Sequence, residues 1–297
     1  MVAFGRTFEN AVALRGRTMR PSIDEIVSVL GRLEILSAEV IDTGQNNHVL
    51  DTGQLIIRVP RHDGACRDLL RETKVLAALA GRLPLPVPAA SVVTLASGIV
   101  ATHTKLPGTP LLDLAGMSDT RRQQLASPLA GFLRALHALP LDSLGVRNEA
   151  HDPLTEWRDL FSDVVEKVLP LVPADIAIAI RGNFERFLSA DSEQLATAII
   201  HGDFGTGNIL VDDGQVSGVI DFAGCSIGDP AHDLASLSAG LGDDFLALMH
   251  PYYPGIDAMQ DQIRFYRSTF PLLDVLFGLE HGDDGALNAG LEALRRG

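Results

Sequence analysis

Two acidic residues and one amide stand close together in a single short stretch of this sequence. Asp203 follows an apolar run, Asn208 precedes a second apolar run, and Asp221 follows a third. The turn dipeptide Asp213-Gly214 separates the second run from the third, which is typical of a β-hairpin. Such a hairpin would bring the three polar side chains together at its open ends.

Two carboxylates and an amide arranged in this way suit phosphoryl transfer. One carboxylate receives the proton of an attacking hydroxyl group, while the amide and the other carboxylate hold Mg²⁺ on the phosphates. We therefore assign Asp203 as the catalytic base and Asn208 and Asp221 as ligands of Mg²⁺. Taken singly, each is also a common turn residue for backbone reasons, but this alternative does not explain all three in register.

The spacing resembles the protein-kinase signature H-R-D-L-x-x-x-N followed by D-F-G. This sequence has His201-Gly202-Asp203 with Asn208 in step, then Asp221-Phe222-Ala223. Together with Gly228-Asp229-Pro230 and Asp233-Leu234-Ala235, the stretch resembles the aminoglycoside phosphotransferase family of kinase-fold enzymes. The C-terminal sequence is similar to those of gentamicin-type 2''-phosphotransferases and of viomycin and capreomycin kinases.

The resemblance covers nearly everything after residue 21 and implies an α+β fold of the protein-kinase type. Such a fold has two lobes, a small N-lobe with an antiparallel sheet and a mainly helical C-lobe. We expect residues 1–20 to be an extension, residues 21–104 to be the nucleotide-binding N-lobe, and residues 105–297 to form the catalytic and substrate-binding C-lobe.

Hydrophobic periodicity predicts the elements that position these residues. Strands are expected at residues 39–42, 48–51, 54–59, 92–95, 99–102 and 198–200, besides the hairpin that follows Asn208. Helices are expected after Ser22 and at residues 63–79, around 125–136, 154–169, 175–188, 234–240, 243–249, 257–280 and 285–294. Asp229, Asp233 and His201 are expected to support this framework rather than to react.

The resemblance places a conserved type of ion pair in the N-terminal part. The strand at residues 55–58 ends in Arg58, where the kinase strand carries a lysine, and Glu72 lies in the next predicted helix. Arginine keeps the charge but differs from lysine in geometry. Arg58 therefore either contacts the nucleotide phosphates or only pairs with a helix carboxylate. For Glu72 the alternative is a solvent-facing position.

Two other segments are implied in nucleotide binding. Asn46 lies in the loop at residues 44–47, where a kinase has its glycine-rich lid, but this loop has one glycine and an ordinary turn is equally consistent. Residues 102–108 resemble the hinge whose backbone meets the purine. The residues assigned to the nucleotide there are Ala101, Thr102, His103 and Thr104, and main-chain recognition does not separate ATP from GTP.

The acceptor is expected to be a small cationic molecule. The net charge is −14; residues 1–104 hold 11 basic and 10 acidic side chains, whereas residues 105–297 hold 13 and 28. Such a field repels nucleic acid and attracts cations, although acidic surfaces also serve solubility. Pro230 follows Asp221 so soon that a protein kinase's peptide platform does not fit. We assign as candidate substrate-binding acids Asp243, Asp244, Asp274 and Glu280.

Bulk composition is that of a globular protein. The 297 residues are 46% hydrophobic and 21% charged, and two of them are cysteines. No apolar run reaches the roughly 18 residues of a membrane span. We expect a cytoplasmic monomer that uses Mg²⁺ and ATP or GTP and has no membrane or nucleic-acid partner. The alternatives to an antibiotic kinase are a kinase of an endogenous amino alcohol, such as choline or homoserine, and a nucleotide-binding pseudokinase.

Overall fold

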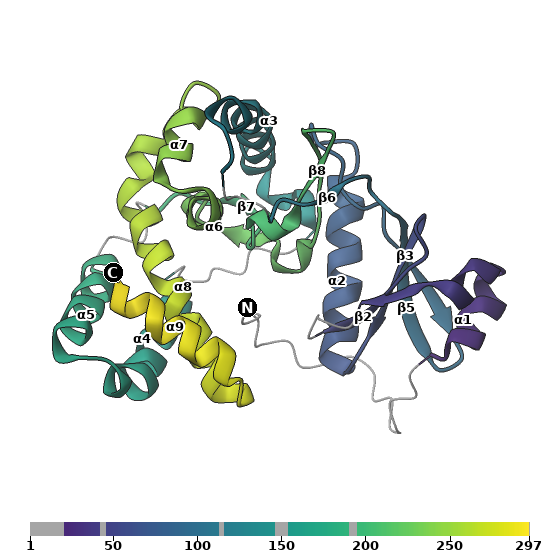
Figure 1. The fold of residues 1–297 in the computed structure, drawn as a ribbon, viewed down its shortest axis with the longest axis horizontal. Coiled ribbons are helices and arrows are strands. Elements are labelled where there is room, and N and C mark those ends of the chain that lie inside the picture. Colours follow the sequence, from purple (N-terminus) through teal and green to yellow (C-terminus); the bar gives the residue numbers. More distant parts are fainter. Residues whose placement is uncertain (1–20, 42–45, 113–115, 146–153, 190–194, 297) are drawn as a thin grey trace.

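The computed structural model describes residues 21–41, 46–112, 116–145, 154–189 and 195–296. Its N-terminal part is a five-stranded antiparallel sheet, and its C-terminal part is mostly helical (Figure 1). The predicted α+β class is therefore confirmed. The predicted extension at residues 1–20 and the loop residues 42–45 lie outside the described residues.

The N-terminal sheet has the strand order β1-β2-β3-β5-β4. Its strands are β1 (Glu39–Ile41), β2 (Asn47–Asp51), β3 (Leu55–Pro60), β4 (Ser91–Leu95) and β5 (Gly98–Thr104). The predicted hairpin between β2 and β3 is present, and Gly53 supplies the positive φ of 87° that its turn needs. Strand β5 lies inside the sheet, between β3 and β4, and so places its backbone close to Arg58 on β3.

Two helices pack against this sheet. Helix α1 (Ile23–Leu30) begins after Ser22, whose hydroxyl accepts a hydrogen bond of 3.2 Å from the backbone N–H of Glu25. Helix α2 (Asp63–Leu79) has the predicted bounds. It stands between the sheet and the C-terminal elements (Figure 1), so that it contacts both parts.

The C-terminal part contains seven described α-helices, close to where periodicity predicted them. They are α3 (Asp119–His137), α4 (Thr155–Asp163), α5 (Ala174–Leu188), α6 (Ala231–Leu241), α7 (Asp243–Met249), α8 (Gln260–His281) and α9 (Asp284–Arg296). The segment predicted as one helix around residues 154–169 differs from the prediction, because α4 continues as a π-helical turn at Val164–Val168 and then as a 3₁₀ turn.

Short strands join the helices to the candidate site. Strand β7 (Ala198–Ile200) pairs with β10 (Ser226–Gly228), and β8 (Ile209–Asp212) pairs with β9 (Gln215–Val219). The last pair is the predicted hairpin, with both turn residues at positive φ, 43° at Asp213 and 83° at Gly214. Sequence patterning did not predict β6 (Thr109–Pro110), which pairs with β8, because two residues are too few to show a period.

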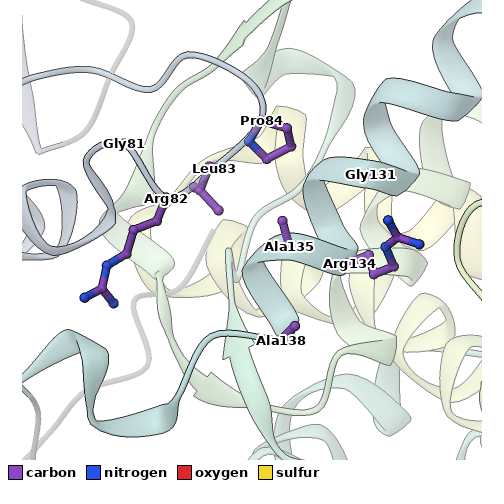
Figure 2. A pocket seen from close by; sticks show the side chains of 8 residues that line it. All are labelled: Gly81, Arg82, Leu83, Pro84, Gly131, Arg134, Ala135 and Ala138. Carbon is purple, nitrogen blue, oxygen red and sulfur yellow. The ribbon is translucent and has the colours of Figure 1, made fainter.

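A groove of about 630 Å³ lies between the residues that follow α2 and the middle of α3. None of the candidate site residues lines it; its walls are Gly81, Arg82, Leu83, Pro84, Gly131, Arg134, Ala135 and Ala138. In Figure 2 the side chains of Arg82 and Arg134 extend in opposite directions, so the two guanidinium groups do not converge on one ligand.

The described residues form two hydrophobic cores. The smaller lies under the sheet and contains Ile26, Ile35, Leu50, Ile57, Val59, Leu95 and Val100. The larger lies among the C-terminal helices and also includes Val75, Leu76 and Leu79 from α2. Burying an aliphatic side chain of this size contributes roughly 1.5–3 kcal/mol, so these three residues hold α2 firmly against the C-terminal part.

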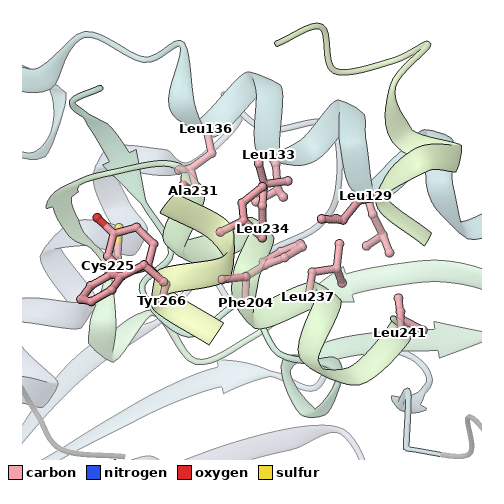
Figure 3. Packing of buried hydrophobic residues seen from close by; sticks show 14 of the residues in the cluster. Leu129, Leu133, Leu136, Phe204, Cys225, Ala231, Leu234, Leu237, Leu241 and Tyr266 are labelled. Atoms are coloured by element: carbon pink, nitrogen blue, oxygen red, sulfur yellow. The ribbon is translucent and has the colours of Figure 1, made fainter. Parts of the chain in front are cut away.

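The residue after Asp203 is anchored in the larger core. Figure 3 shows leucines of α3 and of α6 facing one another, with Phe204 beside them. Phe204 is fully buried, and its ring stacks on that of Phe132, with centroids 5.5 Å apart. Asp203 is therefore next in the chain to a residue that is fully packed in the larger core.

Among the described residues, no helix is both long enough and apolar enough to cross a membrane.

Helices α8 and α9 approach each other closely at Gly290. A Cβ atom at this position would lie 2.6 Å from the carbonyl oxygen of Pro271 and 2.7 Å from Cγ2 of Val275. We expect Gly290→Ala to lower the free energy of unfolding by about 1–3 kcal/mol, because it overpacks this contact. Thermal and urea unfolding measure the change.

Gly182→Ala in α5 is the matched control. A Cβ atom at Gly182 would meet nothing within 4 Å, so alanine should stabilise that helix by about 0.5–1 kcal/mol. Equal effects at the two positions would contradict the close approach of α8 and α9.

Candidate active site

The loop before Asp203 is held by a buried carboxylate. Asp233, on the first turn of α6, is completely buried. Its Oδ2 accepts a hydrogen bond of 2.7 Å from the backbone N–H of His201, and its Oδ1 accepts one of 2.9 Å from that of Gly202. Burial alone would raise the pKa of Asp233, but the hydrogen bonds and charges contributed by His137 and His201 together outweigh it, and the pKa is lowered. The carboxylate therefore fixes the backbone that carries the proposed base.

A second layer of hydrogen bonds supports Asp233. Nε2 of His137, the last residue of α3, lies 3.0 Å from Oδ2 of Asp233, and its Nδ1 lies 2.9 Å from the hydroxyl of Tyr253. Burial raises the pKa of Tyr253 to about 12, so this hydroxyl keeps its proton and can donate it to the ring. His137 thus connects the buried carboxylate of Asp233 to the hydroxyl of Tyr253.

His201 supports the same loop, as expected. Its Nε2 lies 3.1 Å from the carbonyl oxygen of Ile220, and its Nδ1 lies 3.3 Å from the backbone N–H of Asp203. A carbonyl only accepts and an N–H only donates, so these bonds require the neutral tautomer with the proton on Nε2. His201 thus joins the loop of Asp203 to the end of the hairpin.

Gly202 and Gly224 are where two loops touch. Gly202 has a φ of 81°, and a Cβ atom there would overlap the carbonyl group of Gly224. The loop before Asp203 therefore packs directly on the loop after Asp221. A side chain at position 202 would separate them, which explains why this sequence has glycine in that place.

Asp203 and Asn208 are in direct contact. Nδ2 of Asn208 donates two hydrogen bonds of 2.9 Å, one to the backbone carbonyl and one to Oδ2 of Asp203. Burial raises the pKa of Asp203, and the negative charge of Asp221 raises it further. A carboxylate that is oriented in this way and made more basic is suited to accept a proton.

Asp221 lies between the two other carboxylates of the site. Its charge raises the pKa of both Asp203 and Glu72, in each case after the larger effect of burial. Its backbone is in the left-handed region, with φ 63° and ψ 72°, which is uncommon for a residue other than glycine and is typical of constrained functional loops. The three side chains predicted for phosphoryl transfer are thus grouped.

The donor set fits Mg²⁺ bound together with phosphates. The described residues contain no cluster of three or more His, Cys, Asp or Glu side chains able to hold a metal by themselves. Mg²⁺ on a nucleotide needs only one or two protein carboxylates, because phosphates and water complete its shell. Asn208 gives both amide hydrogens to Asp203, so its amide oxygen could bind such an ion together with the carboxylate of Asp221.

Glu72 joins the sheet, α2 and the loop after Asp221. Both its oxygens lie 2.7 Å from Nη1 of Arg58 on β3, and its Oε1 accepts a hydrogen bond of 3.2 Å from the backbone N–H of Phe222. Glu72 is buried, so the solvent-facing alternative is wrong. Its pKa is raised by burial despite the charge of Arg58. No described residue bonds the other terminal nitrogen of Arg58.

Arg71, next to Glu72 on α2, was not singled out from the sequence. Its two terminal nitrogens donate to the backbone carbonyls of Cys225, at 2.8 Å, and of Ala223. The consecutive Arg71 and Glu72 therefore hold the loop after Asp221 through three backbone groups. Single-sequence patterning gives no signal for this role, because the acceptors are main-chain atoms some 150 residues away.

The assigned nucleotide-binding residues of the sheet are distributed over β3, β5 and the residue before β2. On β5, Ala101 pairs with Arg58 of β3, and Thr102 is the last residue that also pairs with β4. The backbones of His103 and Thr104 beyond it have a neighbouring strand on one side only. Burial lowers the pKa of His103. Asn46 lies at the start of β2, where its carbonyl accepts from the backbone N–H of Arg61.

The assigned substrate-binding acids are spread over the C-terminal helices. Asp243 forms an ion pair with Arg267, and Asp244 forms one of 2.7 Å with Arg122. Asp274 is exposed on α8, although partial burial raises its pKa. Glu280 is also exposed, at the end of that helix. No hydrogen bond or ion pair within the described chain joins any of the four to Asp203.

We expect Asp233→Asn to lower the free energy of unfolding at pH 7 by about 3–5 kcal/mol, because it removes a buried charge that accepts two backbone hydrogen bonds. The folded pKa of Asp233 is depressed, so its stabilisation is present above the unfolded value of about 3.9 and is lost as pH falls through the lower folded value. Urea unfolding across pH 3–7 measures both effects.

The matched control is Asp243→Asn, which removes an exposed ion pair and should cost at most about 1 kcal/mol. If the two asparagine variants lose the same stability, or if the loss in Asp233→Asn does not depend on pH, the role assigned to Asp233 is wrong.

Comparison with known proteins agrees with this geometry. The model of a phosphotransferase enzyme family, APH, matches residues 37–262. Viomycin phosphotransferase of Streptomyces vinaceus is 30% identical over 268 residues, which are 86% of this chain and 92% of that protein. Hygromycin-B 4-O-kinase of Escherichia coli is 24% identical over 172 residues, 54% of this chain and 46% of that protein.

Solved structures show the same fold. The GDP and kanamycin complex of APH(2'')-IIIa has a TM-score of 0.83 at 22% identity and covers 92% of this chain and 96% of its own. A type I macrolide 2'-phosphotransferase has a TM-score of 0.68 at 23% identity, and the match covers 86% of this chain and 90% of that protein. The resemblance inferred from the motifs is thus confirmed, and the chain belongs to the APH family of phosphotransferase enzymes.

Proposed function

We propose that this protein transfers the γ-phosphate of ATP or GTP to a hydroxyl group of a cationic small molecule, in the first place an aminoglycoside-like antibiotic. The observation that carries the proposal is the grouping of Asp203, Asn208 and Asp221 beside the Glu72–Arg58 pair. Residues with a purely structural role have no reason to place Asp221 so close to Asp203 that its charge adds to the rise in the pKa of Asp203 caused by burial.

In this proposal Asp203 is the base. Asn208 binds one oxygen of its carboxylate, so the other is directed to an acceptor hydroxyl. The hydroxyl proton passes to Asp203 as the acceptor oxygen attacks the γ-phosphorus in line, and the P–O bond to the nucleoside diphosphate breaks. Proton transfer and correct placement of the two reactants supply much of the rate.

The nucleotide would lie between β5 and the loop after Asp221. The backbones of His103 and Thr104 offer an edge with one unpaired side for the purine, and Arg58 offers a second terminal nitrogen to a phosphate. Mg²⁺, when held by Asn208 and Asp221, would neutralise part of the phosphate charge. The residues between β5 and β6 then connect the nucleotide-binding part to the helical part, which supports a division between the two lobes after Thr104.

The acceptor class follows from charge and from relatives. Residues 105–297 hold 28 acidic and 13 basic side chains, so the helical part attracts cations. Relatives named for viomycin and hygromycin B support an antibiotic acceptor. A kinase for an endogenous amino alcohol would use the same base and the same charge, so the choice between the two is a matter for a substrate panel.

The decisive experiment measures consumption of ATP and of GTP by the purified protein with aminoglycosides, viomycin, macrolides and small amino alcohols. We expect stimulation by at least one cationic antibiotic. Asp203→Asn should reduce kcat about 10²–10⁴-fold, the usual contribution of a general base. Asp213→Asn, at the tip of the hairpin, is the matched control and should retain full activity.

Activity on an amino alcohol alone would assign the enzyme to metabolism. Nucleotide binding without any turnover would favour a pseudokinase. Full activity of Asp203→Asn would show that the base has been misassigned.

Arg58 provides a second test, because Glu72 engages only one of its terminal nitrogens. Arg58→Met should raise KM for the nucleotide about tenfold or more, since one charge-assisted hydrogen bond is lost. It should also lower the free energy of unfolding by about 3 kcal/mol, because the buried Glu72 loses its partner. Arg58→Lys should restore most of the stability. If KM stays unchanged in Arg58→Met, the pair has a structural role only.

A further inference from the structure

Three aromatic rings from different helices meet in the C-terminal part. They are Trp157 of α4, His232 of α6 and Phe270 of α8, called the ring set below. The ring centroids of Trp157 and His232 are 6.4 Å apart, and those of His232 and Phe270 are 5.9 Å apart. All three side chains are partly exposed, so the set combines a packed interior with an accessible face.

Two members of the ring set pack against the buried ring of Tyr266. This residue is buried, and its ring centroid lies 4.9 Å from that of Trp157 and 5.4 Å from that of His232. Its hydroxyl donates a hydrogen bond of 2.9 Å to Oδ2 of Asp229. Because Tyr266 cannot move without breaking that bond, the rings in front of it are preorganised.

His232 is the member of the set that the fold itself does not explain. Its Nδ1 is buried and has no hydrogen-bond partner among the described residues. An unpaired buried nitrogen is unfavourable, and phenylalanine would fill the same space without it. His232 is nevertheless only partly buried, so its ring packs with the other two and still reaches the surface of the set.

The ring set is connected through one neighbouring residue to the loop that carries the proposed base. His232 precedes Asp233, whose carboxylate holds the backbone of His201 and Gly202. Burial lowers the pKa of His232, while the charges of Asp233 and Asp203 act in the opposite direction. The net direction is downward, so the imidazole is neutral at neutral pH and does not repel a cation.

A carboxylate lies on the same face of α8 as one member of the ring set. Asp274 is four residues after Phe270 on α8, so the two side chains lie on one face of that helix. It forms no ion pair with a described residue, whereas Asp243 and Asp244 are engaged by arginines. Of the acids assigned on these helices, Asp274 is therefore the one placed to meet a cation near the rings.

We infer that the ring set is the subsite that holds a cationic group of the acceptor, an ammonium or a guanidinium, against the faces of Trp157 and His232. Cations are attracted to the faces of aromatic rings, most strongly to that of tryptophan, and Asp274 adds negative charge beside them. The inference rests on the proposed function and names the residues that would recognise its substrate.

Trp157 is the single tryptophan of the chain, so its fluorescence reports on ligand binding at the ring set even when no phosphoryl transfer takes place. We would titrate the full-length protein with kanamycin and with viomycin in the absence of nucleotide. A saturable change in the emission of Trp157 is expected. His232→Phe should keep the affinity, because it keeps the ring, and His232→Gln should weaken binding roughly tenfold.

Two further variants guard against a simple folding defect. Asp274→Asn changes an exposed side chain and should also weaken binding, with less dependence on salt. Tyr252→Ala removes an exposed aromatic ring outside the set and should leave binding unchanged. Circular dichroism and melting temperature check that each variant is folded.

The outcomes separate this inference from the proposed function. Turnover of a probe with unchanged Trp157 emission overturns the ring set and leaves the kinase standing. Saturable emission changes without turnover support the ring set and count against the kinase. If His232→Phe and His232→Gln lose the same affinity, the ligand is recognised by hydrogen bonding to the imidazole and not by the face of the ring, and the inference is overturned. Unchanged emission with both kanamycin and viomycin also overturns it.

Discussion

The arrangement of this site depends on the need to satisfy two buried carboxylates. A buried charge is unfavourable unless it is paired and hydrogen-bonded, and the side chains of Asp233 and Glu72 both accept bonds from backbone N–H groups of nearby loops. Asp233 holds the residues before Asp203, and Glu72 holds Phe222, the residue after Asp221. The same bonds that neutralise these acids therefore orient the two carboxylates that are proposed to act on phosphate.

The two held loops constrain each other. Gly202 contacts the carbonyl group of Gly224, and Arg71 binds the carbonyl groups of Ala223 and Cys225. Because Val75, Leu76 and Leu79 of α2 belong to the larger hydrophobic core, Arg71 and Glu72 are held against the helical part. Movement of the sheet relative to that part would be transmitted to Asp221, and the geometry for catalysis depends on how the two cores pack.

Charge works differently at short and at long range. At short range, burial and then the neighbouring carboxylate of Asp221 raise the pKa of Asp203, the proposed base. At longer range, the surplus of acidic residues in residues 105–297 creates a field that attracts cations. Two of these acids, Asp243 and Asp244, already form ion pairs with arginines of the same chain. A count of charges thus indicates the class of ligand but not the residue that binds it; burial and pairing decide that.

The sequence by itself determined the local features. The hairpin around Asp213-Gly214, the extent of α2 and the family motif were readable from it, because turn chemistry, periodicity and fixed spacing act between residues that are near in the chain. Only the tertiary structure decided that Glu72 is buried against Arg58, that Arg71 binds the loop after Asp221, and that His232 lies among aromatic rings. Each of these depends on atoms brought together from distant segments, and a single sequence has no pattern that records such contacts.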